Sequence, residues 1–230
     1  MSRWLVAPCA SGGRAAMVWD SGSLVGIDQV AVAEDALVSV DMYGRASIWK
    51  AKDGLLARRL LHSHGKYEYS TSAVAAGQLN GRSVVVTGRD DGSVQIWKAR
   101  DGRPVGKAFK AAADGRVAIT VGRVGGIDVI VSGSQKGEVC IWDASKRRQI
   151  GTAFGGHTGE VTGVAIGRTG KRDFIVSCGT DNTIRVWQAG LKNPVAILDL
   201  LAQPVSVACG RTGIIAVAVG TAVCVFASSA

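Results

Sequence analysis

The chain has 230 residues, of which 47% are hydrophobic, and it carries a formal net charge of +9. This length and apolar content are those of a single folded domain and exclude a disordered chain. Because it has no run of about 18 apolar residues, we expect no membrane span. The positive charge would favour an acidic partner.

Short apolar segments that end in an aromatic residue recur from the beginning of the chain to its end. The intervals between their last residues are 30, 48, 45, 45 and 39 residues. Those last residues are, in chain order, Trp19, Trp49, Trp97, Trp142, Trp187 and Phe226. A repeat of about 40–45 residues is typical of the four-stranded blades of a β-propeller. Two-helix repeats have a similar length, but the composition of these segments does not fit them.

Each unit reads as a series of hairpins. Residues 72–97, 117–142 and 161–187 each contain three runs rich in β-branched residues, separated by glycine-rich or Asp-Asn turns. Two-residue hairpin turns need positive φ, which the dipeptides Asp91-Gly92, Lys136-Gly137 and Asp181-Asn182 can adopt. Because no segment has a sustained period of 3.6 residues, the sequence predicts an all-β fold.

Residues 156–187 resemble the WD40 repeat most fully. They contain Gly156-His157, a strand ending at Ser177, a turn at Asp181 and a strand ending at Trp187. The resemblance, closest to the bacterial type of tandem repeat, implies a buried hydrogen-bonded relay of His157, Ser177, Asp181 and Trp187. The other units contain only some of the residues of this relay. Their relay residues are Thr87, Asp91 and Trp97, then Ser132 and Trp142, then Ser39 and Trp49; Tyr67, Lys136 and Tyr43 stand where relay residues are expected.

The predicted architecture is therefore a β-propeller of four-stranded antiparallel blades, about six in number, formed by residues 1–230 as a single domain. The chain begins in an apparent second strand, 4–11, and ends in an apparent third strand, 222–226. We therefore expect incomplete first and last blades. Two alternatives stay open: an irregular ring, or an open arc cut from a longer propeller, which we prefer.

The sequence predicts no enzyme, no cofactor and no metal site. The five cysteines form no CxxC pair, and we expect buried free thiols in a cytoplasmic protein. His62 and His64 have only Glu68 nearby, so an exposed loop is expected rather than a metal site. Ser177 and Thr87 lack the setting of a nucleophile, and the Gly-Arg-x-Gly turns join strand to strand rather than strand to helix.

Two surfaces are candidates for partners. Of the 27 basic residues, 15 lie in turns expected on one face, and the site residues proposed there are Arg100, Arg103, Arg147, Arg148, Arg168 and Arg172. The opposite face carries Tyr43, Arg89 and Lys136 as candidate protein contacts. The leading hypothesis is a non-catalytic protein-interaction scaffold or sensor, with self-association through the end blades as a further possibility. The alternative is a propeller that binds nucleic acid or another polyanion through its basic face.

Overall fold

The computed structural model describes residues 4–6, 17–19, 27–34, 36–41, 43–50, 55–60, 70–113, 115–170, 172–188, 193–210 and 213–226. All regular secondary structure in these ranges is β-strand, as the sequence predicts. The same ranges contain no helix long and apolar enough to cross a lipid bilayer.

The strands form six antiparallel sheets that follow the order of the chain. A two-stranded ladder of β1 (Trp4–Val6) and β2 (Met17–Trp19) comes first. The first blade contains β3 (Ile27–Val32), β4 (Ala36–Asp41), β5 (Ala46–Lys50) and β6 (Leu56–Leu60). The second blade contains β7 (Thr71–Leu79), β8 (Arg82–Arg89), β9 (Ser93–Lys98) and β10 (Phe109–Lys110).

Three further blades complete the described chain. The third contains β11 (Val117–Val124), β12 (Ile127–Ser134), β13 (Val139–Asp143) and β14 (Arg148–Gln149). The fourth contains β15 (Val161–Thr169), β16 (Arg172–Gly179), β17 (Thr183–Trp187) and β18 (Ala196–Asp199). The fifth contains β19 (Pro204–Cys209), β20 (Ile215–Val219) and β21 (Ala222–Phe226).

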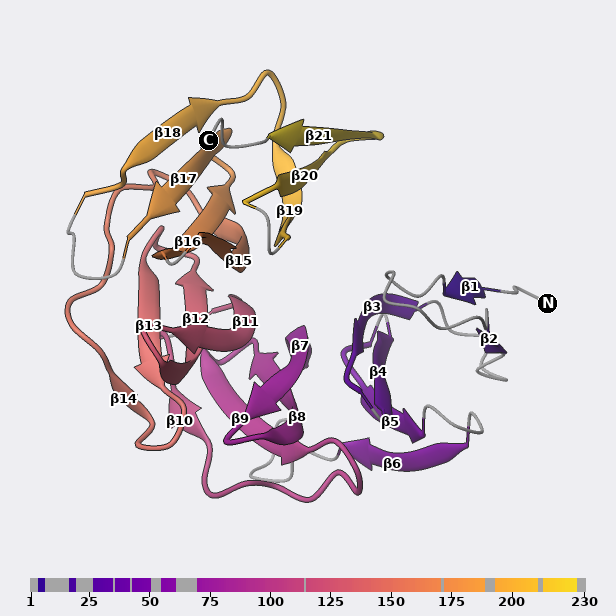
Figure 1. The fold of residues 1–230 in the computed structure, drawn as a ribbon. Coiled ribbons are helices and arrows are strands. Elements are labelled where there is room, and N and C mark those ends of the chain that lie inside the picture. The colour runs from indigo at the N-terminus through magenta and orange to yellow at the C-terminus, as the bar shows by residue number, and fades with distance from the viewer. Residues whose placement is uncertain are drawn as a thin grey trace.

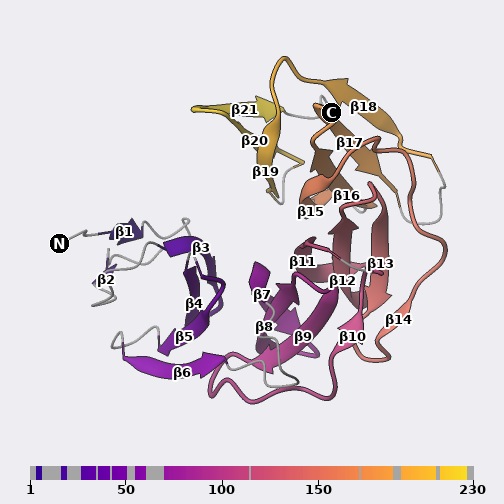
Figure 2. The same ribbon diagram turned by 180° about the vertical axis from the view of Figure 1, so that it is seen from behind.

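The blades follow one another around an arc, with the β1–β2 ladder at one end and the fifth blade at the other (Figures 1 and 2). The innermost strands β3, β7, β11, β15 and β19 together line a central cavity. The described residues thus form five blades and not about six, because the unit that ends at Trp19 contributes only the short β1–β2 ladder. The two end sheets have two and three described strands, and the expectation of incomplete end blades stays a prediction. The single-domain assignment and the choice between ring and arc stay predictions.

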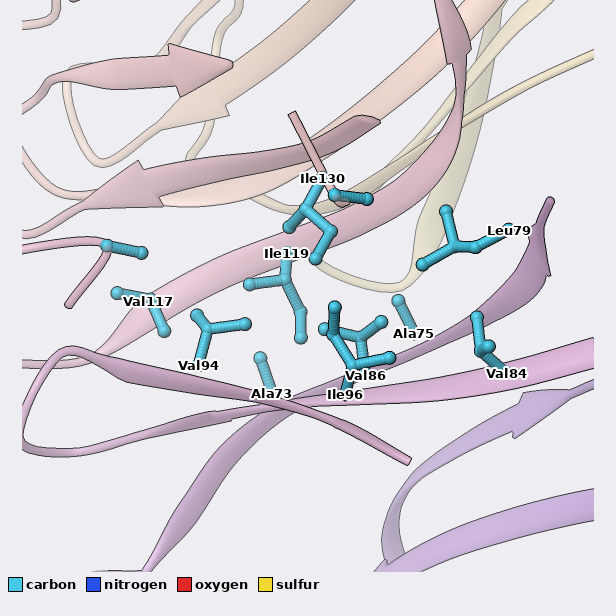
Figure 3. Packing of buried hydrophobic residues seen from close by; sticks show 12 residues of the cluster. Ala73, Ala75, Leu79, Val84, Val86, Val94, Ile96, Val117, Ile119 and Ile130 are labelled. Atoms are coloured by element: carbon cyan, nitrogen blue, oxygen red, sulfur yellow. The ribbon is translucent and has the colours of Figure 1, made fainter. Parts of the chain in front are cut away.

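The apolar core is divided into four clusters, one at each boundary between neighbouring blades. Figure 3 shows the cluster between the second and third blades, where Val86 and Ile96 lie beside Ile119 and Ile130. Each fully buried side chain of this size stabilises the fold by roughly 1.5–3 kcal/mol. Because the middle strands are covered on both faces, they are continuously apolar rather than alternating.

Polar contacts also cross the blade boundaries. Asp128 at the start of β12 accepts a hydrogen bond of 2.6 Å from the backbone N–H of Asn80 in the preceding blade. Asp173 in β16 likewise accepts one of 2.9 Å from the N–H of Gly125, and it forms an ion pair with Arg168. Both hydrogen bonds span 48 residues. The first turn of one blade is therefore tied to the second strand of the next.

The turns between the second and third strands have the left-handed residues that the sequence predicts. Gly92 and Gly137 each have a φ of 78°, and Asn182 has a φ of 60°. A Cβ atom at Gly92 would lie 2.6 Å from the carbonyl oxygen of Ala112, which belongs to the connection to the next blade. Glycine is thus needed here both for its conformation and for the close approach of another backbone segment.

Candidate functional site

Four side chains of the fourth blade form a continuous hydrogen-bonded chain. The indole N–H of Trp187 donates to Ser177 Oγ over 2.8 Å, and Ser177 Oγ lies 2.7 Å from His157 Nε2. On the other side of the imidazole, His157 Nδ1 lies 2.9 Å from Asp181 Oδ2. Ser177 and Trp187 are completely buried, and His157 is nearly so. The structure therefore brings together the four residues that the WD40 resemblance implies.

The protonation states of this hydrogen-bonded chain follow from burial at His157 and from hydrogen bonding at Asp181. Burial lowers the pKa of His157 and outweighs the opposing effect of its hydrogen bond with Asp181. Burial acts to raise the pKa of Asp181, but hydrogen bonds from His157, Thr183 and the Thr158 backbone lower it overall. The site thus holds a neutral imidazole beside a carboxylate. With its proton on Nδ1, His157 donates to Asp181 and accepts from the Ser177 hydroxyl, so every buried donor has an acceptor.

Two further members of this network were not anticipated from the sequence. The Thr183 hydroxyl donates to Asp181 Oδ1 over 2.9 Å and accepts a bond of 3.2 Å from Arg185 Nε. Arg185 Nη2 also lies 3.8 Å from Asp181 Oδ2. A threonine two residues after a turn aspartate is a local signal for this contact, because such side chains commonly bond within the same turn.

The other blades repeat only part of the network. Indole N–H groups donate to hydroxyls ten residues earlier in three blades, at 2.8 to 2.9 Å. These pairs are Trp49 with Ser39, Trp97 with Thr87, and Trp142 with Ser132. In the third blade, which has no relay histidine, the Ser132 hydroxyl donates to the carbonyl oxygen of Ala111 instead.

The acid expected in the second blade makes local contacts. Asp91 accepts hydrogen bonds from the backbone N–H and the hydroxyl of Ser93, and Lys110 Nζ lies 3.2 Å from its carboxylate. Tyr67, which stands at the histidine position of this unit, lies outside the described residues. Asp91 therefore orders its own turn through the same kind of Asx contact that Asp181 makes with Thr183.

The order of Asp181, His157 and Ser177 is that of a catalytic triad, but its setting is not. A nucleophilic serine must reach a substrate, whereas Ser177 has no exposed surface. Its Oγ already accepts the indole N–H of Trp187. This geometry keeps buried polar groups satisfied and gives the hydroxyl no access to a reacting carbonyl. In the described part of the chain, no three His, Cys, Asp or Glu side chains are placed to hold a metal ion.

The proposed basic face is formed by the turns between first and second strands and between third and fourth strands. Arg100, Arg103, Arg148, Arg168 and Arg172 are exposed there, whereas Arg147 is half-buried. Some of this charge is neutralised locally. Arg168 Nε lies 2.5 Å from Asp173, and Arg103 Nε lies 3.7 Å from Asp101.

The opposite face differs from expectation at one position. Tyr43 is 63% exposed and Lys136 is exposed, so both are accessible. The guanidinium carbon of Arg45 lies 5.4 Å from the centre of the Tyr43 ring. Arg89, expected as a surface contact, is only 8% exposed. It ends strand β8 and is buried there, so this correction removes it from the accessible surface.

Several residues singled out in the sequence lie outside the described ranges. These are His62, His64, Glu68 and Cys9. The described cysteines carry free thiols. Cys140 and Cys178 are buried, which keeps them away from solvent.

Comparison with known proteins agrees with this geometry. Residues 147–188, which contain the complete relay, match the WD40 family, described as "WD domain, G-beta repeat". The crystal structure of RRP9 WD40 repeats superposes with a TM-score of 0.59 at 14% identity, covering 89% of this chain and 77% of that chain. The chain has no significant match among curated proteins. The chain thus has the fold of a β-propeller, and residues 147–188 of it match the WD40 repeat.

Proposed function

We propose that the chain is a non-catalytic protein-interaction scaffold. The observation that carries this proposal is the contrast between the relay and the turns. The groups with the chemistry of an active site, Ser177, His157 and Asp181, are enclosed and hydrogen-bonded to one another. The side chains offered to solvent lie on turns held by a rigid β framework, which is the usual arrangement of a binding surface.

The face with the turns between second and third strands supports a partner surface around Tyr43 and Lys136. Tyr43 presents a large exposed ring, and the exposed Arg45 lies against it while its guanidinium pairs with Asp41 over 2.6 Å. Tyrosine and arginine are enriched among residues that dominate interface energy. Lys136 lies at the equivalent turn of the third blade and adds a cation to the same face.

The test begins with capture of proteins from the source cell on the immobilised chain and continues with the purified partner. Binding is then measured by calorimetry for the native chain, for a Tyr43→Ala, Lys136→Ala double variant, and for Arg148→Ala as a control on the opposite face. The double variant is expected to bind at least about tenfold more weakly, which corresponds to about 1.4 kcal/mol. An unchanged affinity of the double variant, or recovery of no specific protein, would contradict the proposal.

The second candidate function is binding of a polyanion such as nucleic acid. It is supported by the exposed arginines Arg100, Arg148 and Arg172. The pairing of Arg168 with Asp173 weakens it. Six phosphate contacts would reduce affinity about 10³-fold or more between about 50 and 200 mM salt. A duplex DNA titration that shows no binding at low salt rejects this function.

A sensor role and a cytoplasmic location are further proposals. So is self-association of the chain through its end blades. Self-association is supported by Val205, Val223 and Val225, which are exposed on the fifth blade. Ala216 and Ala218 pair with Val225 and Val223, so the same side of this sheet carries no charge. Sedimentation measurements over a range of protein concentrations test it, and a strictly monomeric chain would rule it out.

A further inference from the structure

A cavity of about 450 Å³ opens between the second and third blades on the basic face. Ligand pockets commonly have volumes of roughly 300–1,000 Å³. Its walls come from three turns: the β7–β8 turn, the connection after β9, and the β13–β14 turn. The lining residues are Leu79, Asn80, Arg82, Ser83, Val84, Ile96, Lys98, Val105, Ala144, Ser145 and Arg147.

The floor of this pocket is apolar and continuous with the core. Leu79, Val84 and Ile96 belong to the cluster between the second and third blades and appear in Figure 3. Val105 packs against the same cluster. An apolar group placed in the pocket would therefore contact an ordered hydrophobic surface, which favours its transfer from water.

The remaining walls carry one sign of charge. Arg82, Lys98 and Arg147 all line the pocket, and no acidic residue lines it. Arg82 and Lys98 are exposed, so their charged groups are accessible to a ligand. The combination of three cations with an apolar floor is complementary to a ligand that has both carboxylates and an apolar group.

Arg147 is held in place by the neighbouring blade. Its Nη2 donates to the carbonyl oxygen of Val105 over 2.7 Å. Gly106 leaves the room that the guanidinium occupies, since a Cβ atom there would collide with it. Arg147 also has a positive φ of 53°. Its Nε is buried and has no hydrogen-bond partner in the described part of the chain. A guanidinium fixed in this way places a positive charge at the wall of the pocket, which favours a carboxylate there.

We propose that this pocket binds a short acidic segment of a partner protein, which inserts one apolar side chain between flanking carboxylates. The inference rests on the proposed scaffold function and gives it a second surface, opposite Tyr43. Several carboxylates along an extended peptide match three cations from three separate segments better than one lipid headgroup does. The lining polar groups Asn80 and Ser83 offer further hydrogen bonds to a peptide.

The probe is the fluorescein-labelled peptide Gly-Asp-Glu-Leu-Asp-Glu-Gly, and binding is followed by fluorescence anisotropy. One control peptide has glycine in place of the leucine, and another has amides in place of all carboxylates. Both controls are expected to bind at least about tenfold more weakly, because each removes one half of the complementarity.

Protein variants separate the pocket from the general charge of the face. Lys98→Glu and Arg82→Glu, both at exposed positions, are each expected to weaken binding of the acidic peptide by at least about tenfold. Arg148→Glu makes the same change of charge on the same face but outside the pocket, and it is expected to weaken binding less than about threefold. Thermal melting of each variant checks that the fold is retained.

Three outcomes would overturn the proposal. The first is equal weakening by Arg148→Glu and Lys98→Glu, which would show an unspecific charge effect. The second is equal binding of the leucine and glycine peptides. The third is binding of sodium decanoate without binding of the acidic peptide, which would assign the pocket to a fatty acid. Each of these leaves the test at Tyr43 and Lys136 unaffected, so the scaffold function can stand without the pocket.

Discussion

Phe154 stacks on Trp187 with ring centroids 5.2 Å apart and an interplanar angle of 24°. Phe154 lies in the connection that leads from the third blade into the fourth, and Trp187 ends strand β17 of the fourth blade. The stacking therefore attaches the connection between the third and fourth blades to the third strand of the fourth blade. Trp187 stabilises the fold through this stacking and through its hydrogen bond to Ser177.

Trp187→Ala is expected to lower the free energy of unfolding by about 3–5 kcal/mol, because it leaves a large cavity and removes the hydrogen bond that Ser177 Oγ accepts. Urea unfolding followed by circular dichroism measures this. Trp49→Ala is the matched control, since Trp49 makes the same kind of hydrogen bond but is only half-buried. Trp49→Ala should lower the free energy of unfolding by less than Trp187→Ala does. Equal stability of Trp187→Ala and the native chain would mean that the relay does not support the fold.

His157 gives the protein a defined sensitivity to acid. Its pKa is lowered by burial in the folded chain, so the unfolded chain takes up the proton first when the pH falls below about 6.5. Stability should therefore decrease from about pH 6.5 downward until folded His157 is also protonated. Asp181 has a lowered pKa, so the stability that its carboxylate contributes is lost only at pH values below about 3.8.

The measurement compares urea unfolding at about pH 7.5 and about pH 5 for the native chain and for His157→Gln. Glutamine has a donor and an acceptor but does not titrate. The native chain should lose more stability between these two pH values than the variant does. A variant with the same loss would show that His157 is not the group responsible.

Gly137 and Gly81 allow steric and conformational effects to be separated. Both have positive φ, 78° and 68°. A Cβ atom at Gly137 would collide with the carbonyl oxygen of His157, whereas nothing lies near the equivalent position at Gly81. Gly81→Ala should cost about 1–2 kcal/mol from backbone strain alone. Gly137→Ala should cost clearly more in urea unfolding, and equal costs would argue against the close contact with His157.

The thiols of three buried or half-buried cysteines should resist alkylation in the native state. Burial raises the pKa of Cys140 and Cys178 to about 11 and that of Cys209 to about 12. The reactive thiolate is therefore scarce at about pH 8. Peptide mapping after treatment with iodoacetamide should find these cysteines unmodified in the folded chain and modified in concentrated urea. Rapid native modification of Cys178 would contradict its burial in the fourth blade.

The sequence was sufficient for the features that repeat with the blade. The ten-residue separation of Ser177 and Trp187 recurs in the other units, and hairpin register alone brings such pairs together. The blade count was less accurate, because the unit ending at Trp19 carries the apolar pattern of a blade, but its described residues form only a two-stranded ladder.

Contacts between blades could not be read from the sequence. The burial of Arg89 is a property of the folded chain, whereas the local sequence pattern shows only that it ends a strand. The pocket at Arg147 is likewise formed by contacts between segments that are far apart in the sequence. Its guanidinium bonds to Val105, which is 42 residues earlier, and no motif links these two positions.

The carboxylates Asp128 and Asp173 hold the turn of the preceding blade at an identical offset of 48 residues. A blade copied in tandem would carry both groups of such a junction. Its aspartate would accept from the turn of the blade before it, and the backbone N–H of its own first turn would donate to the aspartate of the blade after it. Gene duplication can thus add one blade without requiring a new kind of contact between blades. Loss of the acid from a single copy would loosen one junction and leave the others intact.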